Sequence, residues 1–377
     1  MNPINSIRSS NVKTLGKSWK VVEENREPAE SVNRKECKSE NDIRTVDCWG
    51  QSIDLALSVR GREALRAVGL EEVVVDHHGI AMRGRMIHNK NGSLKEILYD
   101  GVNQNCIYSV TRRYLNIVLL NAAEKYSEVS LHFNKKVVDA DLDDGKLTIL
   151  DTRTRKIEKA KADLIIGADG AYSIIRRTMA KKPRFNCSQT YIEHGYLELF
   201  VPSGKNNECK PYHVGKTTLL LGDAAHAMVP FYAQGMNTGF EDVLLLDELM
   251  ERYNSDFSKV LPKFSELRCE DAHAICDLAM YNYVEMRDLV RKKSFLVRKY
   301  IDTFLYKRIP KTWIPLYSTI HFSRMRFRDC IANKQWQDKV GRNTMKKINN
   351  RIRIIQNVLE QLSFYRYYAE PLGARYS

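Results

Sequence analysis

The sequence predicts an α/β fold, because strand-like and helix-like segments alternate over much of its first 255 residues. Residues 136–141, 146–151 and 163–167 are short runs with strand character, and residues 113–126 place Leu, Val and Ala side chains on one helical face. Glycine-containing turns with an acidic residue follow two apolar runs. Such turns are typical of open sheets that bind ligands at the carboxyl ends of their strands.

The chain begins without a regular pattern. Residues 1 to about 45 alternate charges with no sustained periodicity, so we expect loop or disorder there instead of the strand that opens a nucleotide-binding fold. A short strand is expected at residues 52–57, and residues 62–68 form a helical turn that Gly69 ends. The turn Asp-Asp-Gly at residues 143–145 joins the first two strands named above.

The carboxy-terminal part is expected to be mainly α-helical. Helices are predicted at residues 243–253, 262–268 and 271–300. Near the end, apolar residues recur at steps of three and four between basic residues, which predicts an amphipathic basic helix. Its apolar stripe is Met345, Ile348, Ile352, Ile355, Leu359 and Leu362, and its flanking cations are Lys346, Lys347, Arg351 and Arg353.

The net charge of +14 is concentrated at this end of the chain. Residues 291–377 hold 20 Lys and Arg against 5 Asp and Glu, whereas the first 290 residues hold 40 against 41. The tail therefore has two open alternatives, which are binding to an anionic membrane surface and packing against helices of the same chain or of another copy. We expect no nucleic acid partner, because no recognised binding module is present.

Composition excludes several classes of protein. With 377 residues, of which 43% are hydrophobic, the chain can bury a core of ordinary size in two or three domains. Its eight cysteines show no C-x-x-C pair and no metal-ligand spacing, so we expect free, mostly buried thiols in a reducing compartment and no metal. No secretory signal and no membrane span is expected, because no apolar run has the necessary length.

Two segments combine the residue types that a dinucleotide cofactor requires. Residues 163–173 read as a buried strand that stops at an Asp-Gly turn, and residues 219–230 place Asp223 directly after a glycine. Small residues let the backbone approach a cofactor, and a helix that begins near Gly239 can direct its N–H groups at a diphosphate. A carboxylate can accept a hydrogen bond from a cofactor hydroxyl.

These segments resemble the Asp-Gly and Gly-Asp motifs of the FAD-dependent aromatic hydroxylases. Over roughly residues 40–340 the resemblance narrows to the kynurenine 3-monooxygenase family, in particular to its insect members. It is carried by LALSVRGR at 55–62, MRGRMIH at 82–88, KPRF at 182–185, residues 231–242, MYNYVEMR at 280–287 and IPLY at 314–317. In that family FAD, reduced by NADPH, activates O₂ to hydroxylate L-kynurenine at ring position 3, while the protein positions the ring and excludes water.

The resemblance also implies site residues and a location. Cofactor contacts are expected at Arg112, Val137, Asp169, Gly170, Ile174, Gly222, Asp223, Met236 and Asn237, whereas Arg85, Tyr99, Asn282 and Tyr317 are expected to hold the amino-acid end of the substrate. An arginine fork beside a tyrosyl hydroxyl suits a carboxylate. Without the resemblance, Arg85 and the tyrosines read as surface and packing residues. No catalytic side chain is identified, His226 reads as a structural residue beside Asp223, and the family implies the cytosolic face of the mitochondrial outer membrane.

The sequence departs from this family in three places. Residues 1–40 contain Gly16 as their only glycine, so the G-x-G-x-x-G turn that cradles the FAD diphosphate is absent. Asp223 follows Asp169 by only 54 positions, where the family has most of a substrate-covering β-sheet, and Ala233 replaces a glycine.

We therefore expect the remnant of an FAD-binding Rossmann-like domain, with a truncated substrate β-sheet and an α-helical carboxy-terminal region. The expected segments are a divergent start (1–45), an FAD-binding region (46–182 and 214–255) around a truncated substrate segment (183–213), a helical region (256–340) and the basic tail (341–377). The alternative to a monooxygenase is a catalytically inactive variant that acts as a binding or membrane-associated protein.

Overall fold

The computed structural model describes residues 19–23, 54–88, 91–191, 205–285 and 293–368. The chain separates into two compact units, Met1–Arg328 and Asp329–Ser377. The first unit contains five sheets and the flavin motifs, and the second consists of the greater part of one long helix. The segment boundaries proposed from the sequence stay a prediction.

The central sheet is mainly parallel. Its strand order is β1 (Trp19–Glu23), β10 (Leu164–Ala168), β14 (Thr218–Leu220) and β13 (His213–Val214). The first three strands run parallel, and β13 pairs antiparallel at the edge. This arrangement confirms the expected α/β fold.

The expectation of loop or disorder throughout residues 1–45 is wrong at β1. This strand pairs in parallel with β10, with Trp19 opposite Leu164 and Glu23 opposite Ala168. Because the two segments are far apart in the sequence, no local periodicity reports their pairing. The opening strand is therefore present, although the sequence lacks the G-x-G-x-x-G motif that follows this strand in the family.

Four smaller sheets surround this one. They are β2 (Asp54–Leu57), β6 (Ile107–Thr111) and β3 (Ile80–Met82); β4 (Gly84–His88) and β5 (Leu94–Leu98); β7 (Lys135–Asp141), β8 (Lys146–Asp151) and β9 (Ile157–Lys161); and β11 (Asn186–Tyr191) with β12 (Lys205–Lys210). All of their pairings are antiparallel. The strands expected at 136–141, 146–151 and 163–167 are confirmed to within one residue, and the strand expected at 52–57 is confirmed over its described residues. The sheet of β11 and β12 occupies the shortened stretch between the two flavin motifs.

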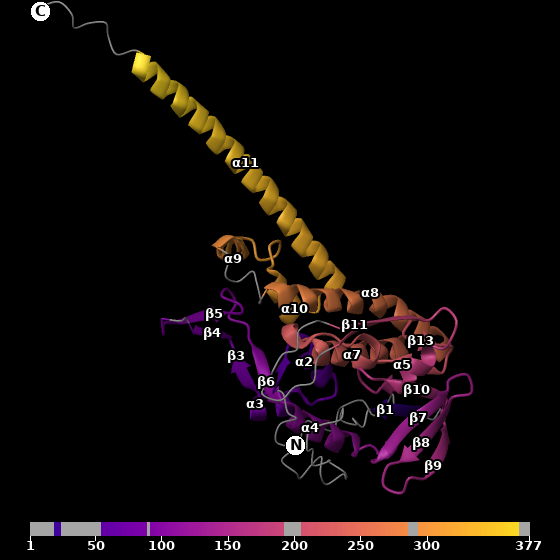
Figure 1. The fold of residues 1–377 in the computed structure, drawn as a ribbon. Helices are drawn as coiled ribbons and strands as arrows, with labels where there is room; N and C mark the ends of the chain where they lie inside the picture. Colours follow the sequence, from indigo (N-terminus) through magenta and orange to yellow (C-terminus); the bar gives the residue numbers. More distant parts are fainter. Residues whose placement is uncertain (1–18, 24–53, 89–90, 192–204, 286–292, 369–377) are drawn as a thin grey trace, which may run out of the picture. The chain divides into compact units, whose positions relative to one another are not determined.

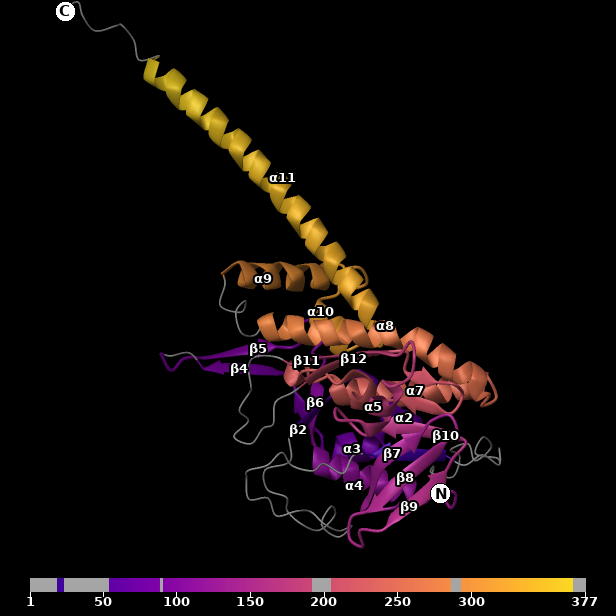
Figure 2. The ribbon, with the colours of Figure 1, turned by 45° about the vertical axis from the view of Figure 1, so that its right-hand side comes forward.

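The described residues also form a series of helices. They are α2 (Val59–Ala67), α3 (Glu71–His78), α4 (Arg112–Ala123), α5 (Ile174–Met179), α6 (Asp223–His226), the 3₁₀ turn η2 (Pro230–Tyr232), α7 (Gly235–Arg252), α8 (Phe257–Val284), α9 (Lys293–Arg308), α10 (Leu316–His321) and α11 (Phe327–Tyr368). Figures 1 and 2 show α7 beside α8, with α2 also packed against α7.

Several helix boundaries differ from the sequence prediction. Helix α2 begins at Val59 instead of residue 62, and α4 ends at Ala123 instead of residue 126. The separate helices expected at 262–268 and 271–300 are in fact α8, which is continuous from Phe257 to Val284, followed by α9. Around the expected break the polar residues are buried, since Arg268 pairs with Asp271 at 3.2 Å and with Asp242 of α7 at 2.5 Å. Helix α7 begins at Gly235, one turn before the expected start near Gly239.

The main core lies between the central sheet and the helices of the motifs. Leu164 and Leu219 on the sheet and Phe264 on α8 are fully buried in this cluster. A second cluster, around Leu57 and Leu115, joins β2 to α2 and α4. The motifs are therefore built on rigid, well-packed elements.

The second unit confirms the predicted helix at residues 345–362, because α11 continues to Tyr368. The side chains of its apolar stripe lie outside the described residues. In the part of the chain that the structure describes, we find no helix with the length and apolar character needed to cross a membrane.

Candidate functional site

Asp169 ends β10 and caps helix α5. Its Oδ1 accepts a hydrogen bond from the Ser173 hydroxyl at 2.5 Å, and its Oδ2 accepts the backbone N–H of Ile174 at 2.6 Å. Gly170 has a φ of 72°, a conformation that favours glycine. The carboxylate is thus engaged within the turn, and its direct contact with a cofactor stays a prediction.

Arg176 joins the two glycine turns, although the sequence reading did not single it out. Its buried guanidinium donates from Nη1 to the carbonyl oxygens of Ala224 at 2.8 Å and Gly170 at 3.4 Å, and from Nη2 to the carbonyl of Ala171. Only its place in the first turn of α5, seven residues after Asp169, could have indicated this role. It fixes the first turn against α6.

Gly222 and Asp223 form the second turn. Gly222 has a φ of 55°, and a Cβ placed on Gly239 would stand 3.5 Å from its Cα, so the turn passes close to α7. The exposed Asp223 begins α6, and its Oδ1 would lie 3.7 Å from a Cβ on Gly235. The carboxylate therefore faces the start of α7.

The start of α7 fits a polar cofactor. This 18-residue helix has no side-chain cap and no acidic residue in its first turn, so the positive end of its dipole is available. The fully buried amide of Gln234 has no hydrogen-bond partner for either Nε2 or Oε1 within the described residues. A buried unsatisfied amide is costly, and the polar edge of a flavin ring would satisfy it. With Asp223 available for a ribitol hydroxyl, these residues fit FAD.

Both polar atoms of the Asn237 side chain form hydrogen bonds within the protein. Its Oδ1 accepts the backbone N–H of Ser58 at 2.8 Å, and its Nδ2 donates to the carbonyls of Ala56 at 2.8 Å and Ala233 at 2.9 Å. Met236 packs on the second core cluster. Any contact of Asn237 with flavin would therefore come from its backbone, and the side chain positions β2 and α2 against α7.

The remaining predicted cofactor residues lie on three further elements. Arg112 is the half-buried first residue of α4, and Ile174 is the first residue of α5. Val137 lies on β7 and packs against the main core. Helix α5, which carries Ile174, packs on β7, which carries Val137. The cofactor contacts of all three residues stay predictions.

All four predicted substrate residues line one cavity of about 310 Å³. Arg85 comes from β4, Tyr99 follows β5, Asn282 lies near the end of α8, and Tyr317 lies on α10. The other lining residues are Ala56, Met82, Ile107, Phe231, Tyr232, Ala233 and His321. The loop directly before α7 thus forms one wall of this cavity.

An aromatic stack organises the cavity. The rings of Tyr99 and Tyr317 are parallel at 5.0 Å, and the ring of Tyr317 is parallel to that of His321 at 4.0 Å. Burial raises the pKa of Tyr317 and Tyr99 adds to the effect, while Arg85 opposes it, so the hydroxyl stays protonated. His321 was not predicted as a site residue, since nothing in its local sequence sets it apart.

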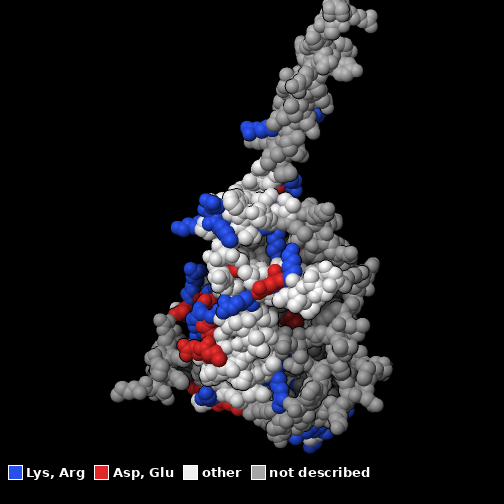
Figure 3. All heavy atoms as spheres, turned by 90° about the vertical axis from the view of Figure 1, so that its left-hand side faces the viewer, with Lys and Arg blue, Asp and Glu red and all other residues white. Residues whose placement is uncertain are grey.

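The cavity lining includes the cation Arg85. Its guanidinium lies 5.6 Å from the centre of the Tyr99 ring. Partial burial and then the positive charge of Arg85 lower the pKa of Lys299 on α9. Figure 3 looks onto the face that carries β4, β5 and α9, where Lys and Arg side chains lie among Asp and Glu side chains and uncharged atoms. Within the lining, the guanidinium of Arg85 is the group that suits a carboxylate.

A buried ionic network holds α2, α7 and α8 together behind the turns. Arg268 donates to Asp242 at 2.5 Å and to Glu241 at 3.0 Å, and Arg60 donates to Glu241 at 2.8 Å. Asp242 also accepts from the Gly222 N–H at 3.0 Å and lies 2.6 Å from His226 Nε2. His226 is therefore structural, as expected, although its partner is Asp242.

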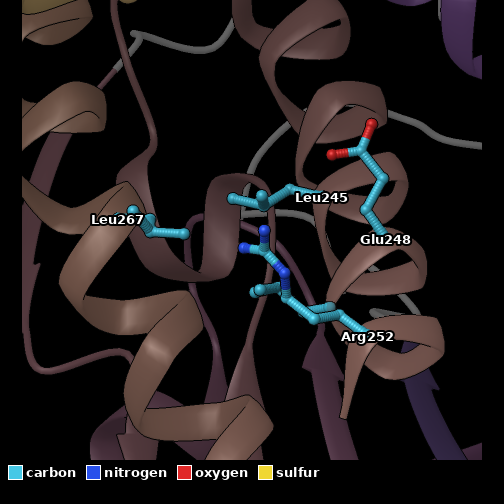
Figure 4. A pocket seen from close by; sticks show the side chains of 5 residues that line it. Leu245, Glu248, Arg252 and Leu267 are labelled. Atoms are coloured by element: carbon cyan, nitrogen blue, oxygen red, sulfur yellow. The ribbon is translucent and has the colours of Figure 1, made fainter. Parts of the chain in front are cut away.

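A second hollow, of about 390 Å³, lies between α7 and α8. Figure 4 shows Leu245 and Leu267 facing it, with the chains of Glu248 and Arg252 along one side. It contains none of the predicted site residues and no unpartnered buried polar atom of the described chain. The cavity around Arg85 is therefore the candidate substrate site.

Comparison with known proteins agrees with this geometry. An FAD binding domain family model matches residues 55–205 and 203–277. The chain is 45% identical to kynurenine 3-monooxygenase from Anopheles gambiae over 384 positions, with 79% of each chain covered. It is 37% identical to the enzyme of that name from Sus scrofa, with 80% of this chain and 82% of the relative covered. Because the first alignment is longer than the part of this chain that it covers, the relative contains residues that this chain lacks.

Solved structures show the same fold. The tetrameric form of 2-methyl-3-hydroxypyridine-5-carboxylic acid oxygenase is 18% identical, with a TM-score of 0.53 over 69% of this chain and 86% of the other. The p-nitrophenol 4-monooxygenase from Pseudomonas putida is 15% identical, with a TM-score of 0.53 over 68% and 84%. At these identities the likeness concerns the fold alone. With the relatives above, it places the chain in the kynurenine 3-monooxygenase family of FAD-dependent monooxygenases.

Proposed function

We propose that this chain binds FAD at the Gly-Asp turn before α6 and uses the adjoining cavity to hydroxylate L-kynurenine, with NADPH as reductant and O₂ as co-substrate. One observation carries the proposal. The four predicted substrate residues come from distant segments, yet they line one cavity whose wall includes the loop directly before α7. A bound substrate ring would therefore lie next to the flavin half of the site.

Different residues of the cavity would bind different groups of the substrate. Arg85 and the hydroxyl groups of Tyr99 and Tyr317 would hold the substrate carboxylate through charge-assisted hydrogen bonds. Asn282, which donates to the Phe231 carbonyl at 2.9 Å, would contact the amino-acid end of the substrate from the end of α8. The aromatic walls orient the ring and exclude water.

The cofactor residues would hold FAD from two sides. Asp223 would accept from a ribitol hydroxyl, while the amide of Gln234 and the open end of α7 would meet the polar edge of the flavin. Bound FAD supplies the activation of O₂ that introduces one oxygen atom into the aromatic ring. Arg176 and Asp242 position the two turns without contacting the cofactor.

The test is turnover and flavin binding by the full chain with added FAD. Conversion of L-kynurenine and NADPH to the 3-hydroxylated product is expected, and Asp223→Ala should raise the dissociation constant for FAD, measured by fluorescence titration, at least about tenfold. Asp139→Ala, which removes an exposed carboxylate from β7, is the control and should leave that constant unchanged. A flavin-loaded chain that forms no product would contradict the proposed reaction, and an unchanged dissociation constant in Asp223→Ala would contradict the assigned turn.

We further propose that the basic end of α11 lies on an anionic membrane surface, with the cytosolic face of the mitochondrial outer membrane as its location. Arg351 and Arg353 are exposed on this helix, and each cation near an anionic leaflet adds on the order of 1 kcal/mol. Flotation with anionic liposomes at low salt, lost at high salt and on deletion of residues 341–377, is expected. Equal flotation of the deleted chain would contradict this role.

A further inference from the structure

We infer that Cys187 and Cys209 form a peroxide-sensitive thiol pair that closes to a reversible disulfide. The two residues are direct cross-strand partners in the antiparallel pair of β11 and β12. Their sulfur atoms are 3.4 Å apart, and both are free thiols. Direct partners in antiparallel strands have Cα atoms about 4.5–5.5 Å apart, which lies within the range that a disulfide spans.

The two thiols differ in accessibility, and this difference sets the order of a two-step oxidation. Cys187 is exposed, so that a small oxidant can reach it. Cys209 is 1% exposed, and burial together with the neighbouring Cys187 raises its pKa above the usual range of a thiol. An accessible sulfur would therefore react first, and the buried sulfur beside it would resolve the product.

The chemistry balances with hydrogen peroxide as the oxidant. The Cys187 sulfur attacks one peroxide oxygen, the O–O bond breaks, and a sulfenic acid and water are formed. The Cys209 sulfur then attacks the Cys187 sulfur, the S–O bond breaks, and the hydroxide leaves as a second water with the proton of the Cys209 thiol. Two thiols are oxidised to one disulfide while one peroxide is reduced to two waters.

The pair lies on the short connection between the two flavin turns. Strand β11 follows α5, whereas β12 leads into β13 and β14 and so to Gly222. The end of β12 is fixed to α8, because His273 Nε2 lies 3.0 Å from the Cys209 carbonyl oxygen and the Tyr212 N–H donates to the Ser265 hydroxyl at 3.1 Å. The resolving sulfur is thus held in place, and the disulfide would fasten β11 to this anchored strand.

Peptide mapping tests the pair directly. The full chain is incubated with excess FAD and treated with increasing concentrations of hydrogen peroxide. It is then alkylated and digested with trypsin. Cleavage after Arg184, Lys205 and Lys216, with the Lys210 bond protected by Pro211, gives peptides 185–205 and 206–216, each with one cysteine. We expect these peptides to become joined with a loss of two hydrogen atoms, and dithiothreitol to separate them.

A matched variant separates native pairing from chance oxidation. The double change Cys187→Ala with Ser188→Cys moves the thiol by one residue, and so to the opposite face of β11. It should form at least tenfold less of the joined peptide at the same peroxide concentration. In Cys209→Ser, where no resolving thiol remains, Cys187 should proceed to the sulfinic acid.

Two results would overturn the inference. The first is equal cross-linking in the shifted variant, since that would reflect unfolding before oxidation. The second is peptide 185–205 that carries only sulfinic acid in the native chain, with no joined product at any peroxide concentration. Circular dichroism of each variant before treatment establishes that the chain is folded.

Discussion

At the scale of single residues, Arg85 shows how position decides the role of a common side chain. In the sequence it is one of two arginines that flank a glycine, and Arg83 is exposed. The structure brings Arg85 against Tyr99 in the lining of the cavity. Its neighbour has the same charge and no place in that cavity, which makes Arg83 a matched control.

Arg85→Ala should therefore raise the KM for L-kynurenine with little change in flavin content. A charge-assisted hydrogen bond contributes roughly 1.5–3 kcal/mol, so kcat/KM should fall about 10- to 100-fold. Tyr99→Phe should act in the same direction with a smaller effect, whereas Arg83→Ala should leave both constants unchanged. Steady-state kinetics with excess FAD measure this, and equal effects of the two arginine changes would remove Arg85 from the substrate site.

His321 is the residue whose protonation couples the cavity to pH. Burial lowers its pKa to about 4, the carbonyls of Tyr317 and Tyr232 oppose this, and the charges of Arg60 and Arg85 add to it. Its folded pKa lies below the ordinary value near 6.5, so the unfolded chain binds the proton more readily than the folded one. Its contribution to stability is intact above pH 6.5 and is lost as the pH falls toward 4.

The variant His321→Gln should not show this pH-dependent loss of stability, because it has no imidazole at that position. Between pH 7 and pH 4.5 the difference in unfolding free energy between the native chain and the variant should shrink by roughly 2–3 kcal/mol. Urea unfolding at several pH values measures it, and His132→Gln, at an exposed position, is the control. A difference that stays constant with pH would show that His321 does not titrate in this way.

At the scale of elements, the Asp242 carboxylate on α7 links the Gly-Asp turn to α8. One oxygen accepts from Gly222 and lies 2.6 Å from His226, while the other accepts from Arg268. Burial raises the pKa of Asp242, but the charges of His226 and Arg268 outweigh this and bring it to about 2. The carboxylate is therefore ionised over the working range, and the geometry of the Gly-Asp turn depends on it.

Asp242→Ala should cost roughly 3–5 kcal/mol of unfolding free energy, because it leaves Arg268 buried without one of its partners. Asp247 on the same helix is an exposed residue. Partial burial of its carboxyl group raises its pKa, and the negative charges of Glu251 and Glu248 raise it further. Asp247→Ala should therefore be neutral or slightly stabilising. Denaturant midpoints of both variants measure this, and a loss below about 1 kcal/mol for Asp242→Ala would show that the network is not needed.

The elements also show where local patterns fail. Strands β7, β8 and β10 were predicted because each carries its own apolar pattern and turn signals. Strand β1 was missed because its partner β10 lies far along the chain. The continuity of α8 was missed as well, and there Arg268 is buried against Glu241 and Asp242 of α7. Both errors involve partners distant in the sequence, which periodicity cannot report.

At the scale of the whole molecule, the proposed cofactor site has two unequal halves. The residues proposed for the flavin half lie around Asp223 and the start of α7. The diphosphate half has its strand β1, but residues 1–40 contain a single glycine, Gly16, which precedes that strand. Residues 24–40, which follow this strand in the sequence, therefore lack the glycines that allow a close backbone approach to a diphosphate.

We expect this chain to bind FAD at least tenfold more weakly than the Anopheles gambiae relative, because each lost diphosphate hydrogen bond removes roughly 1.5–3 kcal/mol. Gel filtration should strip the flavin, and excess FAD should restore it. Fluorescence titration of both proteins in one buffer measures the two dissociation constants. Stoichiometric flavin that survives gel filtration of this chain would show that another segment supplies the diphosphate contacts.

The sequence by itself determined the α/β class and the two glycine turns, because these depend on short motifs and local periodicity. The candidate substrate residues came from the resemblance to a known family. The tertiary structure alone decided which of those residues meet. It gathered Arg85, Tyr99, Asn282 and Tyr317 around one cavity, and it paired β1 with β10. It also showed that the Asn237 side chain serves the fold, since its hydrogen bond with Ser58 joins distant segments and forms only when the chain has packed.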